Sequence, residues 1–356
     1  MKAIVWHGAH DLRFEDVAEP AEPGPGEAIV EVAWCGVCGT DLHEYTEGPV
    51  LIRPTAHALT GEGPPLVLGH EFSGRVVALG PGVAGSGPGL AVGQRVVVDP
   101  CWRCGTCYWC QRGEYHICRV GGSVGLISNG ALARYVRVQA AGIVPLPDAV
   151  DDRVAALVEP LAVGMHAVSK GGVQAGDTVL VMGFGPIGAA VLLAARAAGA
   201  TGRFVAEPQP HRRTLAEALG ATAAFDPNAT DVRREVFLRT SRVGPDVVFD
   251  CTGVPGQLPA AIDAARRGGR VVAVGVGHGG ATVETNKIVL YERQLIGSLG
   301  YQHDLPRVVR LLEAGALDPR PLITAEVPLA SAVEGAFDAL VRDRSHTKVL
   351  VDVGGG

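Results

Sequence analysis

Features that would point to a membrane, an export route or a nucleic acid are missing from this chain of 356 residues. No stretch approaches the ~20 apolar residues that a membrane span needs, and residues 1–7 contain no apolar signal core. Basic residues form no block, and 31 of them stand against 37 acidic residues for a net charge of −6. Aromatic residues make up 5% of the chain and offer no platform for stacked bases. We therefore expect a cytoplasmic protein with neither a membrane nor a nucleic acid as its partner.

The chain is instead rich in apolar residues, glycine and proline. Its length exceeds the usual size of a single core, which predicts about two domains, and its hydrophobic content of 47% is ample for burial. The 49 glycines and 24 prolines indicate a turn-rich β section and several tight backbone contacts. In a reducing cytoplasm its eight cysteines would serve metal binding better than disulfides.

The first ~150 residues have the pattern of short strands separated by turns. Strands are expected at 28–33, 71–79 and 93–98, and proline- and glycine-rich stretches separate them. This part is predicted to be a mostly antiparallel β unit.

The pattern changes near residue 150, where an alanine-rich helical stretch covers 151–170. After it, apolar strands alternate with helices. The expected elements are strand 178–182, helix 187–199, strand 203–206, helix 210–220, strand 247–249, helix 257–267 and strand 270–274. This alternation predicts an α/β fold with a doubly wound parallel sheet.

Four cysteines, Cys104, Cys107, Cys110 and Cys118, follow one another at spacings of three, three and eight. Zn²⁺ takes four tetrahedral ligands at about 2.3 Å from sulfur, and a shell of four thiolates leaves no open position for chemistry. The pattern therefore predicts a structural zinc in a lobe over about 100–120. Free or disulfide-bonded thiols are the alternative, and disulfides in so short a span would be strained.

A glycine-rich turn follows the strand at 178–182 and opens a helix. It consists of Gly183, Phe184, Gly185, Pro186, Ile187 and Gly188. The first glycine permits the turn, the second lets a pyrophosphate approach the backbone, and the third lets helix and strand pack closely. The free N–H groups of the helix favour phosphate. The turn predicts a dinucleotide site, and an ordinary tight turn is the alternative.

Glu207 ends the next strand, about twenty residues further on, where a carboxylate can accept from both ribose hydroxyls and repel a 2′-phosphate. This favours NAD over NADP, although Arg212 and Arg213 follow closely. Four more residues at strand ends are expected to line the cofactor crevice, namely Cys251, Thr252, Val274 and Gly275.

A second group of metal-binding residue types is spread along the chain. Cys38 lies in an expected turn after a strand, His70 and Glu71 follow residues 65–68, and Glu159 stands at the start of the helical section. A catalytic zinc needs about three protein ligands and one open position. Because these residues are far apart in sequence, spacing alone leaves Cys38 and His70 as either ligands or ordinary core residues.

The order of these motifs resembles the zinc-dependent medium-chain alcohol dehydrogenases, over essentially the whole chain. Within that family the chain is similar to the (R,R)-2,3-butanediol dehydrogenases, which are relatives of sorbitol dehydrogenases. The matching stretches are 35–41, 69–71, the four-cysteine lobe, 158–160, the glycine turn, and then 38–45, 48–54, 68–74, 207–208 and 297–301.

The resemblance implies a GroES-like catalytic domain over 1–150 and 294–356, a Rossmann NAD-binding domain over 151–293, and an active site between them. It implies that Cys38 and His70 ligate a catalytic zinc and that either Glu71 or Glu159 supplies the third contact. Asp41 would hold one of the ligands from behind.

By the same resemblance Thr40 bonds the substrate oxygen and His43 passes the proton towards solvent. The implied reaction is hydride transfer between NAD and a secondary alcohol or vicinal diol, with (R,R)-2,3-butanediol and acetoin as the expected pair, two zinc ions per chain, and a homodimer or homotetramer. A polyol, threonine or specialised-metabolite dehydrogenase is the alternative, which pocket residues around Tyr45, Ile52 and Tyr301 would decide. A catalytically silent relative is a further alternative, but Cys38, His70 and Thr40 are all present.

Overall fold

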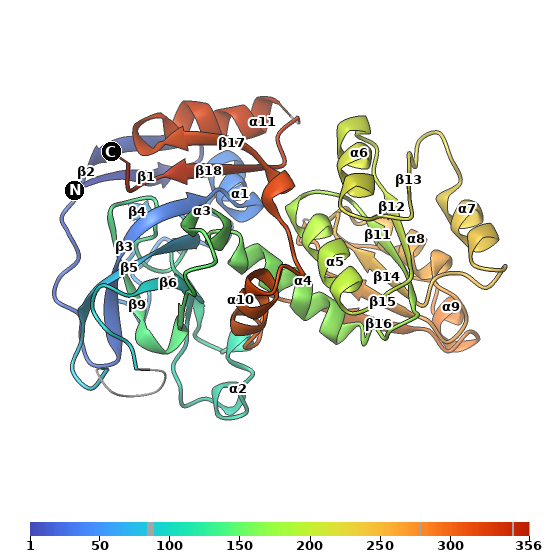
Figure 1. Ribbon diagram of the computed structural model, residues 1–356, viewed down its shortest axis with the longest axis horizontal. Coiled ribbons are helices and arrows are strands. Elements are labelled where there is room, and N and C mark those ends of the chain that lie inside the picture. Colours follow the sequence, from blue (N-terminus) through green and yellow to red (C-terminus); the bar gives the residue numbers. More distant parts are fainter. Residues whose placement is uncertain (84–88, 278, 344, 356) are drawn as a thin grey trace. The chain divides into compact units, whose positions relative to one another are not determined.

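The computed structural model describes residues 1–83, 89–277, 279–343 and 345–355 and forms two compact units (Figure 1). Unit 1 consists of Met1–Glu159, Leu305–Glu313 and Ile323–Gly356. Unit 2 consists of Pro160–Asp304 and Ala314–Leu322. None of the described helices combines the length and apolarity that a membrane span needs.

Unit 1 is built around a sheet in which β3 (Glu27–Gly36) pairs antiparallel with three other strands. The strand order is β10-β6-β5-β3-β18-β17, and β9 also pairs with β3. The other members are β5 (Glu71–Leu79), β6 (Arg95–Val98), β9 (Tyr135–Gln139), β10 (Ile143–Pro145), β17 (Ile323–Pro328) and β18 (Lys348–Asp352). The helices of this unit are α1 (Gly39–Glu47), α2 (Tyr108–Gln111), α3 (Asp152–Ala155), α10 (Leu305–Glu313), α11 (Ala339–Arg342), η1 (Tyr115–Ile117), η2 (Ala140–Gly142), η4 (Leu329–Ser331) and η5 (Val333–Asp338).

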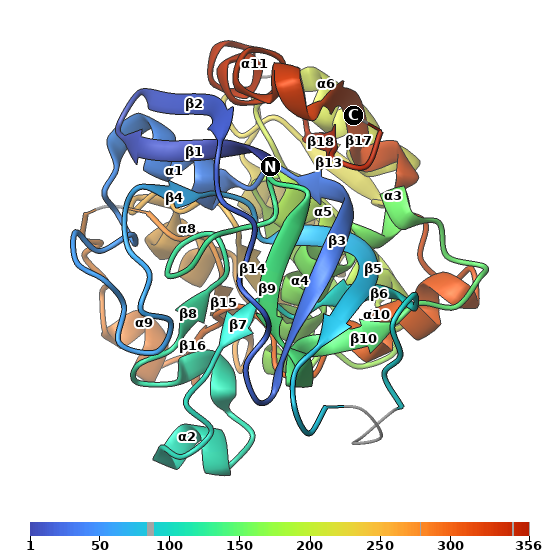
Figure 2. The ribbon, with the colours of Figure 1, turned by 90° about the vertical axis from the view of Figure 1, so that its left-hand side faces the viewer.

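Two smaller sheets complete unit 1. One has the order β2-β1-β4, formed by β1 (Lys2–Gly8), β2 (Asp11–Asp16) and β4 (Leu66–Val67). The other pairs β7 (Cys101–Trp102) with β8 (Gly122–Ser123), and the segment that carries α2 extends beyond these two strands (Figure 2). The core of unit 1 contains the fully buried side chains of Phe72 and Phe337. Burial of such apolar surface stabilises this unit.

Unit 2 is a six-stranded parallel sheet with the order β13-β12-β11-β14-β15-β16. In chain order this is 3-2-1-4-5-6, the arrangement that places a dinucleotide at the reversal point between strands 1 and 4. The strands are β11 (Thr178–Met182), β12 (Gly202–Ala206), β13 (Ala223–Phe225), β14 (Val247–Asp250), β15 (Arg270–Ala273) and β16 (Gln294–Gly297). The helices are α4 (Val158–Lys170), which begins at the end of unit 1, α5 (Pro186–Ala197), α6 (Pro210–Ala218), α7 (Val232–Arg239), α8 (Gln257–Ala264), α9 (Asn286–Val289) and η3 (Arg320–Leu322). The predicted fold class, a parallel α/β sheet with a separate β-rich domain, is confirmed.

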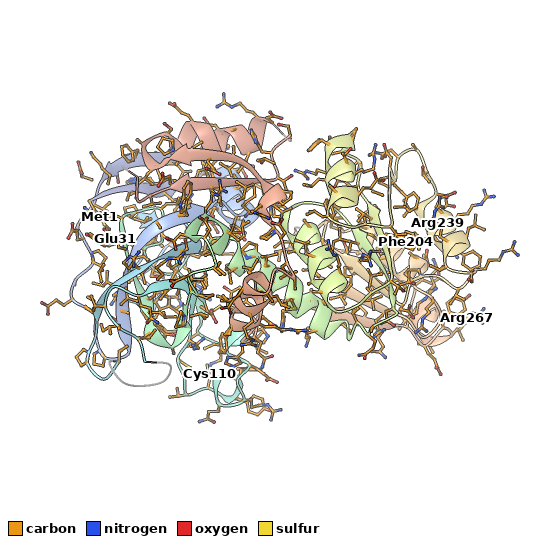
Figure 3. The ribbon with its side chains drawn as sticks, viewed as in Figure 1. Met1, Glu31, Cys110, Phe204, Arg239 and Arg267 are labelled. Atoms are coloured by element: carbon orange, nitrogen blue, oxygen red, sulfur yellow. The ribbon has the colours of Figure 1, made fainter. Side chains whose placement is uncertain are left out.

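Aromatic residues close one flank of the parallel sheet. Phe204 of β12 stacks on Phe225 of β13 with ring centroids 6.2 Å apart, and the guanidinium of Arg239 lies 5.1 Å from the Phe225 ring (Figure 3). Phe204 is buried, so the short outer strand β13 is held by side-chain packing as well as by its ladder.

The bounds of the two units differ from the predicted domain bounds at both ends. Residues 294–297 form β16, which pairs with β15 and so extends unit 2 beyond the predicted limit at 293. Residues 151–159 belong to unit 1, because Ser73 donates to the carbonyl of Asp152 and Arg95 binds its carboxylate at 2.8 Å.

Candidate active site

Cys38 lies where the chain leaves β3 and enters α1. It is the N-cap residue of that helix, and the carboxylate of Asp41 accepts from the backbone N–H of Cys38 at 3.0 Å. This is the second half of a capping box, which satisfies an N–H that the helix itself leaves unpaired. The sequence predicts a turn at this point; the structure shows a helix instead, because Asp41 at the third helical position supports its start.

His70 is held beside the same carboxylate. Its Nδ1 lies 3.4 Å from Oδ1 of Asp41, and both side chains are buried. Burial acts to lower the pKa of His70, but the charges of Asp41 and Cys38 outweigh it and the pKa is raised well above its usual range. Burial acts to raise the pKa of Asp41, and the charge of His70 reverses that effect and lowers it. Gly69 permits this approach at φ +94°, and a Cβ there would lie 2.8 Å from Sγ of Cys35.

Three donor atoms converge at this point. Sγ of Cys38, a ring nitrogen of His70 and a carboxylate oxygen of Glu71 all lie within 4.8 Å of one another. Burial, followed by the charge of Glu71, raises the pKa of the Cys38 thiol. A divalent cation would offset both effects and favour the thiolate. The thiol, imidazole and carboxylate thus form a donor set that fits zinc.

Glu71 has a buried partner, Lys348, that the sequence does not predict. Nζ of Lys348, in β18, lies 2.6 Å from Oε2 of Glu71 and 3.0 Å from the carbonyl oxygen of Val37. Lys348 is 2% exposed and Glu71 is 1% exposed. Gly36 leaves room for this pair, since a Cβ there would lie 2.4 Å from Oε2 of Glu71. A lysine heading an apolar strand was the only signal in the sequence.

The remaining predicted residues lie on α1 and α4. Thr40 and His43 are three residues apart on α1, so they are neighbours on one helix face, and both are partly exposed. Glu159 is in the first turn of α4 and is 7% exposed, but it is not a member of the three-residue donor group. Two of the expected pocket residues are engaged elsewhere: Tyr45 donates to Asp338 at 2.7 Å, and Ile52 is buried in the core of unit 1.

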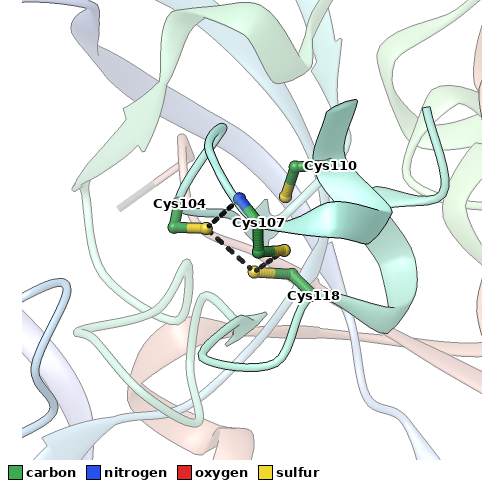
Figure 4. A group of neighbouring side chains, drawn as sticks. All are labelled: Cys104, Cys107, Cys110 and Cys118. Carbon is green, nitrogen blue, oxygen red and sulfur yellow. Dashed lines mark hydrogen bonds between the residues drawn. The ribbon is translucent and has the colours of Figure 1, made fainter. Parts of the chain in front are cut away.

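The four cysteines of the lobe turn their sulfur atoms towards one another (Figure 4). Sγ of Cys118 lies 3.8 Å from Sγ of Cys107 and 3.6 Å from Sγ of Cys104. A disulfide would need about 2.05 Å, whereas a tetrahedron of sulfurs about 2.3 Å from a central zinc has edges of about 3.8 Å. The backbone N–H of Cys107 also points at Sγ of Cys104 at 3.3 Å, as suits a thiolate. The arrangement fits a closed four-thiolate zinc site and does not fit disulfides.

The glycine turn joins β11 to α5 with the geometry that a pyrophosphate requires. Gly183 has a φ of +84°, and a Cβ at Gly188 would lie 2.0 Å from the carbonyl oxygen of Gly183, so neither position accepts a side chain without movement. A Cβ at Gly185 would meet no described protein atom within 4 Å. Gly185 is the N-cap of α5 and makes no side-chain cap, so the N–H groups that follow Pro186, from Ile187 onwards, remain for a phosphate.

Glu207 stands at the end of β12, next to this turn. Its two carboxylate oxygens accept from the backbone N–H groups of Phe184, at 2.7 Å, and Gln209, at 2.9 Å. Each oxygen keeps a second lone pair that a ribose hydroxyl can use. Arg213 donates to the carbonyl oxygen of Glu207 at 2.8 Å, while Arg212 precedes it on α6.

The other predicted cofactor residues lie at the same edge of the sheet. Thr252 follows β14, and a Cβ at Gly183 would lie 2.9 Å from its Cγ2, so the two turns touch. Gly275 follows β15, and a Cβ there would lie 2.2 Å from the N of Gly253. The turn after β15 therefore touches the turn after β14. Cys251 and Val274 are the neighbouring residues of these turns. The carboxyl ends of β12, β11, β14 and β15 therefore form one continuous rim.

Comparisons with known proteins show the family to which the chain belongs. Residues 24–148 match the family model of the alcohol dehydrogenase GroES-like domain, and residues 186–314 match that of the zinc-binding dehydrogenases. The chain is 40% identical over 353 residues to the (R,R)-butanediol dehydrogenase of Bacillus subtilis (strain 168), covering 99% of both chains. A crystal structure of 2R,3R-butanediol dehydrogenase from Bacillus subtilis superposes with a TM-score of 0.91 at 39% identity, again over 99% of both chains.

A crystal structure of a Sinorhizobium meliloti 1021 protein bound to NADP superposes with a TM-score of 0.87 at 33% identity, over 99% of this chain and 98% of that one. These matches cover 99% of the chain and so include both units. This chain therefore belongs to the zinc-dependent medium-chain alcohol dehydrogenases and is an oxidoreductase with a GroES-like and a Rossmann domain.

Proposed function

We propose that the enzyme oxidises secondary alcohols or vicinal diols with NAD, and that (R,R)-2,3-butanediol and acetoin are its substrate and product. The observation that carries the reaction type is the convergence of Cys38, His70 and Glu71 in a chain that also holds a dinucleotide turn. The substrate is supported by the 40% identity to the Bacillus subtilis enzyme of that name.

Cys38 and His70, with Glu71 or Glu159, would hold the catalytic zinc. When bound, zinc supplies a Lewis acid that makes an alcohol more acidic. Asp41 faces Nδ1 of His70, which leaves Nε2 for the metal, and it binds the backbone of Cys38 through its other oxygen. One carboxylate thus orients two proposed ligands, as outer partners of metal ligands commonly do.

Thr40 and His43 would remove the proton of the alcohol. Thr40 accepts it from the substrate hydroxyl and His43, one turn along α1, passes it on, with His43 in reach of solvent because it is partly exposed. Thr40 and His43 both lie on α1, whose N-cap is Cys38, so one helix positions the proposed proton path and one of the proposed metal ligands.

The proposed cofactor is NAD, which accepts the hydride when bound. Glu207 supports this choice, because its carboxylate, 3% exposed, would repel a 2′-phosphate. The similar protein from Sinorhizobium meliloti is bound to NADP. The preference for NAD is therefore tested by comparing kcat/KM for NAD and NADP. The turn residues Gly183, Gly185 and Gly188 would hold the pyrophosphate, with the residues after β14 and β15 along the nicotinamide side.

Further proposals concern the state of the protein. We propose two zinc ions per chain, the second held by the four cysteines of the lobe, whose sulfur distances support it. A homodimer or homotetramer and a cytoplasmic location remain predictions, which sedimentation and cell fractionation would test.

The test is the rate of NADH formation from NAD and (R,R)-2,3-butanediol, followed by absorbance. Wild-type protein and Cys101→Ser, which changes a thiol outside both clusters, should turn over, while Cys38→Ser should not, although it still binds NAD. Turnover by Cys38→Ser at near the wild-type rate would refute the metal site. Turnover of another alcohol only would move the proposal to that substrate and leave the mechanism standing.

A further inference from the structure

Basic residues form no block in the sequence, but the fold gathers five arginines on one part of the surface of unit 2. They are Arg233 and Arg234 of α7, Arg242 just after it, Arg267 after α8, and Arg293 before β16. We call this set the arginine face. Four of the five side chains are exposed and that of Arg293 is half-buried. Its positive charge is opposite in sign to the net charge of the chain, which is −6.

Two of these arginines share one aromatic ring. The guanidinium groups of Arg267 (Figure 3) and Arg293 both lie 4.8 Å from the centroid of the Tyr291 ring. The ring attracts both cations and so offsets part of their mutual repulsion. Burial lowers the pKa of Arg293, and the charges of Arg233 and Arg267 lower it further, against the opposite effect of Asp263. Arg233 therefore links α7 to the group around Tyr291.

Most acidic residues of the same segments are engaged with other basic residues. Glu235 pairs with Arg239 on α7, and Asp263 lies 2.8 Å from Nζ of Lys287. Glu284 lies 3.5 Å from the same ammonium group. Among the described residues of these segments, the carboxylates that remain to oppose the arginine face are those of Asp231 and Glu292. The arginine face therefore keeps an excess of positive charge.

The outward side of α7 also carries apolar side chains. Val236 is the buried residue of this helix, and at 3.6 residues per turn Arg234, Phe237 and Leu238 lie on the opposite side. Phe237 is 41% exposed, Leu238 is 48% exposed, and Val243, just after the helix, is 57% exposed. Arginine and apolar side chains thus point to solvent from the same side of α7.

This combination fits the chemistry of an anionic lipid surface. Guanidinium groups bind lipid phosphates, and apolar side chains enter the boundary between headgroups and acyl chains. A nucleic acid would use the arginines and the ring of Phe237. It offers no apolar phase to Leu238 and Val243, so the exposed apolar side chains favour lipid.

We propose that the arginine face and the outward side of α7 form a docking surface for anionic lipid headgroups, through which the protein binds reversibly to a membrane surface without crossing it. The sequence predicts no membrane partner, because its basic residues form no block. The difference arises because the five arginines come from three separate segments and are brought together only by folding. The inference does not depend on the proposed substrate.

The experiment is cosedimentation of the zinc-loaded protein with vesicles of phosphatidylglycerol and phosphatidylcholine in equal parts, and with vesicles of phosphatidylcholine alone. We expect binding to the anionic vesicles only. Raising the salt from ~0.1 M to ~1 M should lower the bound fraction at least about tenfold, because the Debye length falls from about 10 Å to about 3 Å.

Two double variants separate the contributions of charge and apolar contact. Arg234→Glu with Arg242→Glu should lower the affinity for anionic vesicles at least about tenfold. Phe237→Ser with Leu238→Ser should lower it at least about threefold, through the loss of apolar insertion. All four side chains are exposed, so both variants should keep the wild-type Tm, which thermal unfolding checks.

The matched control is Arg13→Glu with Arg320→Glu, which changes the net charge by the same amount at side chains that are 54% and 66% exposed and lie outside the arginine face. This control should bind vesicles as the wild type does. The inference is overturned if the wild type does not bind anionic vesicles, if the control loses as much binding as Arg234→Glu with Arg242→Glu, or if the protein binds poly(U) RNA and no vesicles. No substrate is present in this test, so its failure leaves the proposed function standing, and a failure to oxidise the diol leaves the docking surface standing.

Discussion

Replacement of Cys107 by serine should remove the zinc of the lobe and leave the donor cluster at Cys38 intact. The lobe contains only two-residue strands and short helices. Besides the four thiols, the segment from Cys104 to Cys118 is held by Tyr115, which is buried and donates to Asp99 at 2.6 Å. Serine is a poor zinc ligand, and the remaining three thiols would bind the metal weakly. Zinc per chain should fall from two to one.

The size of the effect follows from the length of the segment. Closing a loop of about 15 residues stabilises a fold by about 3 kcal/mol in the chain-entropy account. Unit 1 has about 200 residues, for which 1 kcal/mol shifts Tm by about 2–4 °C. Tm should therefore fall by about 6–12 °C in Cys107→Ser. A decrease of this size means that the lobe is destabilised while the rest of the protein stays folded.

The assay combines metal analysis with thermal unfolding, and Cys101→Ser is the matched control, because Cys101 is a neighbouring thiol outside the four. At low temperature, where Cys107→Ser remains folded, its activity should stay close to that of the wild type. If Cys107→Ser keeps two zinc ions and the wild-type Tm, the lobe does not bind structural zinc and the sulfur distances have another cause.

Three other substitutions test separate parts of the structure. Gly188→Ala places a Cβ about 2.0 Å from the carbonyl oxygen of Gly183 and should weaken NAD binding at least about tenfold by calorimetry, through displacement of α5; an unchanged Kd would contradict the turn's role. Glu207→Gln removes the charge that would repel a 2′-phosphate in the proposed cofactor site and should raise the NADP to NAD ratio of kcat/KM at least about tenfold, and an unchanged ratio would mean that other residues discriminate between the cofactors. Tyr45→Phe removes the hydroxyl bond to Asp338 and should lower the free energy of unfolding by about 1–2 kcal/mol in urea titration, whereas no loss would mean that water replaces the bond.

The parts of the fold that the sequence predicts well are those with a strong local pattern. The strand at 178–182 is a continuous apolar run because it is buried on both faces, and the structure places β11 at the same residues. Strand β13 has only three residues, and α7 has a single buried residue, Val236, so neither stands out from a loop in the sequence. Strands β17 and β18 lie in the tail whose return to unit 1 was implied by resemblance alone.

The candidate site divides in the same way. The glycine turn and the four-cysteine lobe are each formed by one short stretch of sequence, so the spacing of their residues along the chain predicts their geometry. The pair of Lys348 and Glu71 joins residues 277 positions apart, through a strand whose neighbours are decided by the packing of the whole sheet. No pattern of residue types carries that information, because a lysine before an apolar run is more often exposed.

The division of unit 1 into three segments has a consequence for the order in which the protein matures. Unit 2 lies mostly in one continuous stretch, Pro160–Asp304, whereas unit 1 needs β18, from the last ten residues or so, to pair with residues 34–36 of β3. Chains are made from the N-terminus, so a ribosome-bound chain carries Cys38, His70 and Glu71 long before Lys348 emerges. Until then Glu71 has no counterion, and the end of β3 that precedes Cys38 is an open strand edge, which is a template for unwanted pairing. A chain cut short before residue 348 would thus present the metal donors in an immature arrangement, with the cofactor unit already assembled.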